Sequence, residues 1–411
     1  MKLFSNLILV ALSAVTGGSD IDFSTGRTCL QITQQESIDP QGYVNPKAVK
    51  ADLPDVAPPV AAADNATNVY SEIGADKMSP AFANVPTRIY VPNHSSNTVT
   101  VIDAASHKIV ETIKVGMGPE HIIPSWDMKT LWVANNANQT KFGSMTPLDS
   151  ITGKAGKQLP VNDPYNMYFA ADGSSAIIVA EAYARLELRD PQTMQLRSMI
   201  EAPNCKGINH ADYTADYSAM LFTCEFSGKL MKVDMKEGKV VDEITLSRPG
   251  SMPQDARLTP DGALFMVTDM ASDGVYFIDA ATFKEVGFLH TGIGAHGLTT
   301  SRDGKKMYVS NRGSNRMPDG ARKAGSVSVI DLATRTVERT WLIPGGGSPD
   351  MGNVTPDGKE LWLSGRFDGQ VYAIDTENGA VTKINVGIEP HGLTVWPQPG
   401  RYSLGHTGNM R

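Results

Sequence analysis

The chain has 411 residues, and its 44 acidic residues outnumber its 37 basic ones, which gives a formal net charge of -7 at pH 7. This balance, without any cluster of Lys and Arg, excludes a nucleic-acid partner, because phosphate binding depends on clustered basic side chains. Hydrophobic residues make up 41% and charged residues 20%, with 38 Gly and 25 Pro. That composition excludes a disordered chain or a long helical array and indicates a turn-rich β protein.

Residues 1–18 have the pattern of a secretory signal peptide. Lys2 precedes the apolar run Leu7–Leu12, and small residues follow as far as Gly18. The run is too short to cross a bilayer, and the alternative is an uncleaved anchor. No later stretch holds eighteen consecutive apolar residues, so we expect a secreted or periplasmic protein with no transmembrane span in the mature chain.

Residues 19–85 form an N-terminal extension in this interpretation. Pro54, Pro58 and Pro59 precede the run Val60–Ala63, and no hydrophobic periodicity is sustained. Such a composition is typical of a tether. The folded domain is therefore expected over residues 86–411.

Seven alternating apolar strands, each ending in Asp, repeat along that domain. They are Thr98–Asp103, Ser144–Asp149, Arg185–Asp190, Lys229–Asp234, Gly274–Asp279, Ser326–Asp331 and Gln370–Asp375. Their final Asp residues lie 41 to 52 positions apart. A period in this range, built from strands of period two, is typical of propeller blades.

The two ends of the repeat array complement each other. The first repeat has no innermost strand before it, whereas the strand Gly392–Trp396 stands near the C-terminus with no partners after it. We therefore predict an all-β fold: a seven-bladed β-propeller of four-stranded antiparallel blades. The C-terminal strand joins the first blade and closes the ring.

Two repeats carry a motif that resembles a known family. Tyr308–Asn311 followed by Ser326–Asp331, and Tyr90–Asn93 followed by Thr98–Asp103, are similar to the YVTN-repeat seven-bladed propellers. The resemblance covers about residues 86–411. Related propellers include surface proteins, lactonases, a streptogramin lyase and the propeller domains of copper and haem reductases, so the resemblance implies the fold without selecting a function.

Four of the eight histidines fall at the start of innermost strands, where the strands enter the central channel. They are His121, His210, His296 and His391. Neutral imidazoles are ligands for transition metals, so these residues are candidate metal ligands, for copper rather than zinc. The spacing leaves their convergence open, because His296 lies seven residues before its turn Asp, whereas His121 and His210 lie six before theirs.

Further polar side chains near the same strand starts are candidate ligand-binding residues: Glu120, Asn166, Asp255 and Asp350. They could bind a ligand directly or orient the imidazoles. A metal-free pocket for a polar small molecule, or polar packing alone, explains the same pattern. Arg312 and Arg366 follow second strands and could face the channel or pair between blades, and His94 is expected on the surface or in packing.

Three cysteines are present, and two of them, Cys205 and Cys224, lie in one blade. They form the favoured disulfide pair, although the loop before the innermost strand must curl back to bring them together. A thiolate ligand beside His210 is the alternative for Cys224. No Cys-x-x-Cys occurs, which excludes a zinc ribbon and covalently attached haem.

These features favour an exported, monomeric binding or scaffold protein, with a small molecule or a protein partner at the mouth of the channel. One alternative is a copper-type oxidoreductase, although no second domain is present to supply electrons. The other is a metal-assisted lactonase or lyase that uses the channel histidines as acid or base. No Gly-x-Ser-x-Gly motif supports a serine hydrolase.

Overall fold

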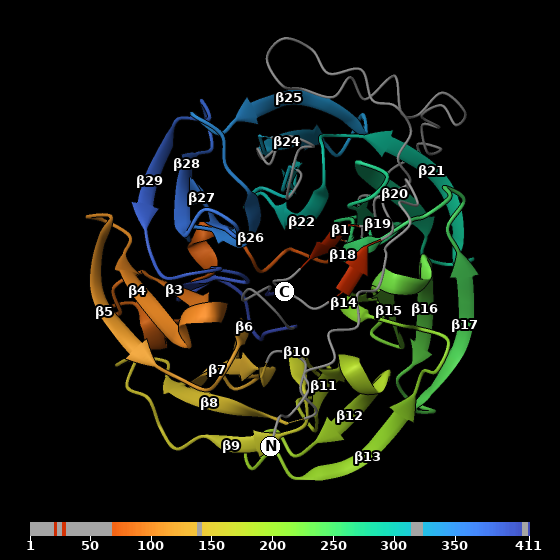
Figure 1. Ribbon diagram of the computed structural model, residues 1–411, viewed down its shortest axis with the longest axis horizontal. Helices are drawn as coiled ribbons and strands as arrows, with labels where there is room; N and C mark the ends of the chain where they lie inside the picture. The colour runs from red at the N-terminus through yellow and green to blue at the C-terminus, as the bar shows by residue number, and fades with distance from the viewer. Residues whose placement is uncertain (1–19, 23–26, 30–67, 138–141, 314–323, 405–409) are drawn as a thin grey trace, which may run out of the picture.

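A computed structural model describes residues 20–22, 27–29, 68–137, 142–313, 324–404 and 410–411. Seven blades surround a central axis (Figure 1), which confirms the predicted seven-bladed propeller. The predicted signal peptide, residues 1–18, lies outside the described residues. So does most of the extension, apart from the two-stranded sheet of β1 (Asp20–Asp22) and β2 (Arg27–Cys29) and the segment from residue 68 onward.

Each blade is a four-stranded antiparallel sheet whose first strand is innermost. The first blade contains β30 (Thr394–Trp396), β3 (Arg88–Asn93), β4 (Thr98–Asp103) and β5 (Lys108–Lys114). The second contains β6 (Pro119–Pro124), β7 (Thr130–Asn135), β8 (Gly143–Asp149) and β9 (Leu159–Val161). The third contains β10 (Pro164–Phe169), β11 (Ala176–Ala180), β12 (Arg185–Arg189) and β13 (Leu196–Glu201). The fourth and fifth contain β14 (Ile208–Tyr213), β15 (Ala219–Cys224), β16 (Lys229–Asp234) and β17 (Lys239–Thr245); and β18 (Pro253–Leu258), β19 (Leu264–Asp269), β20 (Gly274–Asp279) and β21 (Lys284–His290). The last two contain β22 (Ala295–Thr300), β23 (Lys306–Asn311), β24 (Ser326–Asp331) and β25 (Thr336–Leu342); and β26 (Pro349–Val354), β27 (Glu360–Gly365), β28 (Gln370–Asp375) and β29 (Val381–Asn385).

The ring closes as the sequence predicts. β30, from the end of the chain, pairs antiparallel with β3, with Ile89 opposite Val395. Closure removes an edge strand that would otherwise leave backbone groups unpaired on the axis. No helix among the described residues is long and apolar enough to span a membrane.

The repeated Asp at the end of each third strand has a structural cause. In the third blade, Asp190 Oδ1 accepts the backbone N–H groups of Gln192 at 3.0 Å and Thr193 at 2.8 Å. These bonds lower the pKa of Asp190 to about 2, because they stabilise the charged carboxylate. The same Asp turn recurs in other blades, so the repeat seen in the sequence records the hairpin between the third and fourth strands.

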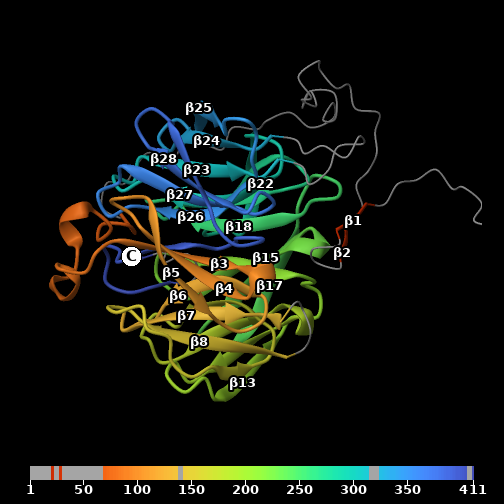
Figure 2. The same cartoon turned by 60° about the vertical axis from the view of Figure 1, so that its left-hand side comes forward.

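Neighbouring blades stand face to face around the ring (Figure 2), and the hydrophobic core lies between them. Leu230 of β16 packs with Phe265 of β19 and Tyr276 of β20, and all three are almost fully buried. Each blade therefore needs its neighbours to bury its faces, as in other repeat folds. Stability depends on a complete ring.

Every long innermost strand has a β-bulge near its start. The register shifts occur at Pro119/His121, Pro164/Asn166, Ile208/Ala211, Pro253/Ala256, Ala295/Gly297 and Pro349/Gly352. A bulge adds a residue, bends the strand and redirects its side chains. This local geometry overrides strict alternation where the candidate site residues lie.

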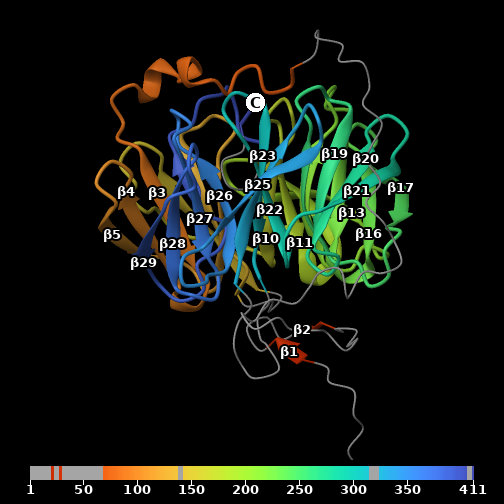
Figure 3. The same cartoon turned by 90° about the horizontal axis from the view of Figure 1, so that it is seen from above.

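We call the end of the channel where the innermost strands begin the proximal mouth and the other end the distal mouth. Residues 68–87, 397–404 and 410–411 lie on the face at the distal mouth (Figure 3). Val69 N–H donates to Pro260 O at 2.9 Å, and Phe82 packs edge-on against Trp396, with ring centroids 5.0 Å apart. The last part of the predicted extension thus packs against the propeller.

Trp396→Ala tests this closure. Trp396 is 1% exposed, and its Nε1 donates to Ser150 O at 2.7 Å, so the substitution removes core packing and a buried hydrogen bond. We expect a loss of about 3–5 kcal/mol in the free energy of unfolding, measured by denaturant titration. Leu342→Ala, at an exposed position of β25, is the control and should change stability by less than about 1 kcal/mol. Equal losses in both variants would contradict the closure.

Candidate functional site

The four candidate histidines come together on the channel axis. Ring centroids lie 5.0 Å apart for His121 and His210, 4.7 Å for His121 and His391, and 6.0 Å for His296 and His391. All four are at most 2% exposed. The bulges explain how His296 joins the others despite its different spacing, so the convergence that the sequence left open does occur.

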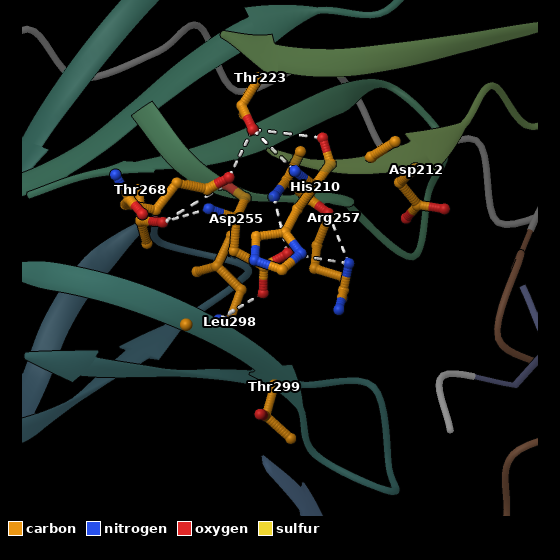
Figure 4. A network of polar contacts seen from close by, with 12 residues as sticks. His210, Asp212, Thr223, Asp255, Arg257, Thr268, Leu298 and Thr299 are labelled. Atoms are coloured by element: carbon orange, nitrogen blue, oxygen red, sulfur yellow. Dashed lines mark hydrogen bonds and ion pairs between the residues drawn. The ribbon is translucent and has the colours of Figure 1, made fainter. Parts of the chain in front are cut away.

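Hydroxyl groups hold the bulged strands in place (Figure 4). His210 N–H donates to Thr223 Oγ1 at 3.0 Å, and that hydroxyl donates to Gln254 O of the next blade at 2.6 Å. Thr268 does the same between Asp255 N and His296 O. Each hydroxyl satisfies an N–H that the bulge removes from the sheet ladder, which fixes the site on rigid backbone.

Asp350 is the negative charge at the centre of one half of the site. Its Oδ1 lies 2.7 Å from His296 Nδ1, and its Oδ2 lies 2.7 Å from His391 Nδ1. Arg312 Nη2 donates to Asp350 Oδ2 at 3.0 Å and to His296 Nε2 at 2.7 Å. Since a guanidinium can only donate, His296 accepts at Nε2 and carries its proton on Nδ1.

The titration of these groups follows from burial and from this charge pattern. Burial opposes ionisation, but Arg312 and the two histidines hold the pKa of Asp350 well below its usual range. Burial, together with Arg312, lowers the pKa of His296 to about 4. Burial also lowers the pKa of His391. At neutral pH both imidazoles are uncharged beside a charged carboxylate.

Glu120 is the corresponding charge in the other half. Arg366 Nη1 donates to Glu120 Oε2 at 2.9 Å, and His94 Nδ1 lies 2.9 Å from Oε1. Asn136 donates to the same oxygen at 3.3 Å. Arg366 and His94 hold the pKa of Glu120 well below its usual range against the effect of burial, and Glu120 raises the pKa of Arg366.

His391 lies between the two carboxylates. Because its Nδ1 faces the charged Asp350, the proton of the neutral ring is on Nδ1 and Nε2 is an acceptor. Nε2 lies 3.6 Å from Glu120 Oε2, which is also an acceptor. Two acceptors therefore face each other, and a hydrogen-bond donor from a bound molecule could donate to one of them.

Asn166 and Tyr165 complete the axial side of the site. Asn166 Nδ2 donates to His210 Nδ1 at 3.0 Å, and Tyr165 Oη lies 3.4 Å from His210 Nε2. The Tyr165 ring lies 5.2 Å from that of His121. Burial raises the pKa of Tyr165 well above its usual value, with a smaller contribution from Glu120, so the phenol keeps its proton and can donate it.

Asp255 makes a different set of contacts. Its Oδ2 accepts the N–H of Leu298 at 2.9 Å and its Oδ1 that of Ala256 at 2.9 Å, and Arg257 Nη1 lies 3.1 Å from Oδ1. These contacts join the fifth and sixth blades (Figure 4). The carboxylate thus braces two strands.

Three partners of the site were not among the primary candidates. Arg312 and Arg366 follow the second strands of their blades and face the channel, one of the two options that their positions left open. His94, in η3 (His94–Ser96), is 4% exposed and contacts Glu120. A shared position after the second strand was the available signal, but it could not distinguish channel contacts from pairing between blades.

Several donor atoms of the predicted metal site already face other side chains. In the described part of the chain, no group of three or more His, Cys, Asp and Glu side chains is placed to hold a metal ion. The nitrogens of His210 face Tyr165 and Asn166, and those of His296 face Arg312 and Asp350. As arranged, these residues do not fit a metal ion, and copper at this site stays a prediction.

Cys205 and Cys224 form a disulfide, with Cα atoms 4.8 Å apart, which confirms the favoured pair. The turn that the bridge requires is present, with Cys205 N–H donating to Ala202 O at 3.0 Å. The alternative of a Cys224 thiolate ligand was wrong, because the sulfur is already bonded to Cys205.

The sequence of the chain is similar to a family of propellers and to a curated protein. The family of YNCE-like beta-propellers matches residues 60–399. Antigen Lp49 of Leptospira interrogans is 25% identical over 302 residues, covering 69% of this chain and 64% of Lp49, so the chain spans less than two thirds of that relative.

Solved structures share the architecture. A candidate 6-phosphogluconolactonase of Bacteroides fragilis has a TM-score of 0.59 at 17% identity, covering 78% of this chain and 100% of that one. The dihydro-heme d1 dehydrogenase NirN in complex with DHE has 0.55 at 14%, covering 74% of each chain. Hydrazine synthase of Kuenenia stuttgartiensis has 0.55 at 18%, covering 66% of this chain and 87% of that one. Identities this low show the fold alone.

Asp350→Asn tests the central carboxylate. The variant leaves Arg312 buried without its counter-charge, so we expect a loss of about 3–5 kcal/mol in unfolding free energy at pH 7. Chemical denaturation measures it, with the exposed Asp242→Asn as the control, expected within about 0.5 kcal/mol of the parent. An Asp350→Asn variant as stable as the control would contradict the pairing.

Stability should fall as the pH drops from about 6.5 to 4. In that interval an unfolded histidine binds a proton, whereas folded His296, whose pKa is lowered to about 4, does not, so acid favours unfolding by up to about 3 kcal/mol. His391 acts in the same direction. Denaturation at several pH values measures the slope, which His296→Gln should reduce and His290→Gln, on β21, should leave almost unchanged. An unaltered slope in His296→Gln would refute this assignment.

Proposed function

The chain belongs to the family of YNCE-like β-propellers, and from that premise we propose that it is an exported binding protein that holds a small, uncharged, hydroxyl-bearing molecule at the proximal mouth of its channel. The observation that carries this proposal is the pair of facing acceptors, His391 Nε2 and Glu120 Oε2, at 3.6 Å. A hydroxyl group placed beside the pair, about 2.8 Å from each acceptor, could donate to either.

A donor is also available at the same mouth. Arg312 Nε is buried and has no hydrogen-bond partner within the described residues. The guanidinium lies 5.4 Å from the centre of the Phe367 ring, which provides an apolar surface beside it. A hydroxyl both donates and accepts, so a molecule with several hydroxyls matches acceptors and donor together.

The charge balance favours an uncharged ligand. Arg312 is compensated by Asp350 and Arg366 by Glu120, and His296 and His391 are neutral near pH 7. A net charge on the ligand would be buried without a counter-charge, which is costly. Polar, uncharged groups avoid that cost.

Export is supported by two independent features. The apolar run Leu7–Leu12 follows Lys2 as in a signal peptide. The disulfide between Cys205 and Cys224 is typical of proteins from oxidising compartments. Fractionation of cells that express the full chain tests this part of the proposal, and recovery of all the protein in the cytoplasm would contradict it.

A ligand panel tests the binding role. Sugars, sugar lactones and polyols are titrated into the full chain, and binding is followed by thermal shift and calorimetry. Tyr165→Phe removes one hydroxyl at the axis and should weaken the best ligand at least tenfold, about 1.4 kcal/mol. Tyr276→Phe removes a buried hydroxyl bonded to Ser251, away from the axis, and should not change affinity. Equal effects of the two variants would contradict the site.

A lactonase is the second candidate, because Asp350 orients His391 with Nε2 free of a proton. In such a site His391 would take a proton from water as the water oxygen bonds to the lactone carbonyl, and would return it to the ring oxygen as the ester C–O bond breaks. Turnover of a lactone that Asp350→Asn abolishes would favour this candidate over binding alone.

Elemental analysis of untagged protein tests the predicted copper, and stoichiometric copper that is lost in His121→Ala would establish it.

A further inference from the structure

A second polar pocket lies at the distal mouth, formed by the ends of innermost strands whose beginnings carry the site described above. Its walls include Arg302, Thr299, Asn353 and Gln398, and Ile73 and Met410 close it from the two chain segments that cross this face. Part of the pocket is open to solvent. Nothing in the proposed function uses it.

Two charged residues line this pocket, Arg257 and Arg302, and Arg302 is the one without an ion pair among the described residues. It lies in the turn between β22 and β23, and it reaches the neighbouring blade, where Nε donates to Thr355 O at 3.0 Å and Nη2 to Val354 O at 2.9 Å. Among the described residues it forms no ion pair. Asp357 is the nearby acid, but its side chain is 56% exposed and lies 3.8 Å from Lys359.

The other cations at this mouth are already compensated. Arg257 lies 3.1 Å from Asp255, and Arg411 donates to Asp212 at 2.7 Å. All four side chains are at most 3% exposed. Arg302 differs from them because, among the described residues, its only nearby acid is the exposed Asp357 and it forms no ion pair. Burial lowers its pKa to about 9, so it remains charged at neutral pH.

A neutral donor accompanies the charge. Asn353 uses its side-chain oxygen to accept the N–H of Val395 at 3.3 Å. Its amide N–H groups then donate to no acceptor in the described structure, and they belong to the wall of the pocket. Arg302 uses Nε and one N–H of Nη2 for the two carbonyls, which leaves Nη1 and the second N–H of Nη2 as donors. These N–H groups and the amide of Asn353 are a donor set for an oxygen-bearing anion, since Arg donates in one plane to carboxylate and phosphate oxygens.

We propose that this distal pocket binds a small oxyanion, a phosphate or carboxylate group, through Arg302 and Asn353. The bound group supplies Arg302 with a counter-charge in direct contact, which the exposed Asp357 does not. Because Ile73 and Met410 belong to the segments that close the mouth, the anion also ties these segments to the ring. Binding of the anion should therefore stabilise the folded chain.

Titration of the full chain with inorganic phosphate and, separately, with acetate tests the proposal, with sodium chloride at matched ionic strength as the reference. We expect saturable calorimetric binding and a rise in melting temperature for at least one oxyanion beyond that in chloride. Arg302→Gln should weaken that binding at least tenfold. Arg339→Gln, at an exposed position of β25, should bind as the parent does.

Two results would overturn the proposal. One is the absence of saturable binding by the parent protein for both oxyanions, with stabilisation no greater than chloride gives. The other is unchanged affinity in Arg302→Gln. The titration of the parent decides whether the site exists even where Arg302→Gln fails to fold, and Asn353→Ala then replaces it as the variant, with a similar loss expected.

Discussion

The closure of the ring by β30 is the constraint on which the rest of the structure depends. Each blade buries its faces only against its neighbours, so an open ring would expose the cores between the first and last blades. Closure also places His391 on the axis, because that residue precedes β30 and faces His121 of the next blade. Fold and site therefore share one interaction between segments just over three hundred residues apart.

Burial of charge on the axis is the second organising feature. Asp350 and Glu120 are almost fully buried, and each is paired with an arginine that enters from after a second strand. Such pairs contribute little net stability, but the loss of one partner is costly. The pairs thus fix the tautomers of the neighbouring imidazoles, which gives the channel a defined pattern of donors and acceptors. The distal mouth differs, because among the described residues Arg302 donates only to backbone carbonyls there and forms no ion pair.

The sequence was sufficient for the architecture, because the turn after each third strand needs an Asp and the strands alternate strictly. It also located the four histidines, which share a position near the start of innermost strands. Their side-chain directions could not be predicted, since they depend on bulges that alternation does not encode. Asp255 illustrates this limit, because it lies near the start of an innermost strand, as Asp350 does, while its carboxylate braces two blades instead.

Partners from distant positions were harder to find. The roles of Arg312 and Arg366 depend on which ion pairs form across the ring, and this could not be predicted from their positions. His94 was expected on the surface or in packing, but it contacts Glu120. The protonation of His391 is the point at which all these contacts meet. Nitrogen-15 NMR of the histidine-labelled chain, with the resonance assigned through His391→Asn, measures it directly. A neutral ring protonated on Nδ1 at pH 7 is the predicted result, and a ring protonated on Nε2 or doubly protonated would contradict the arrangement.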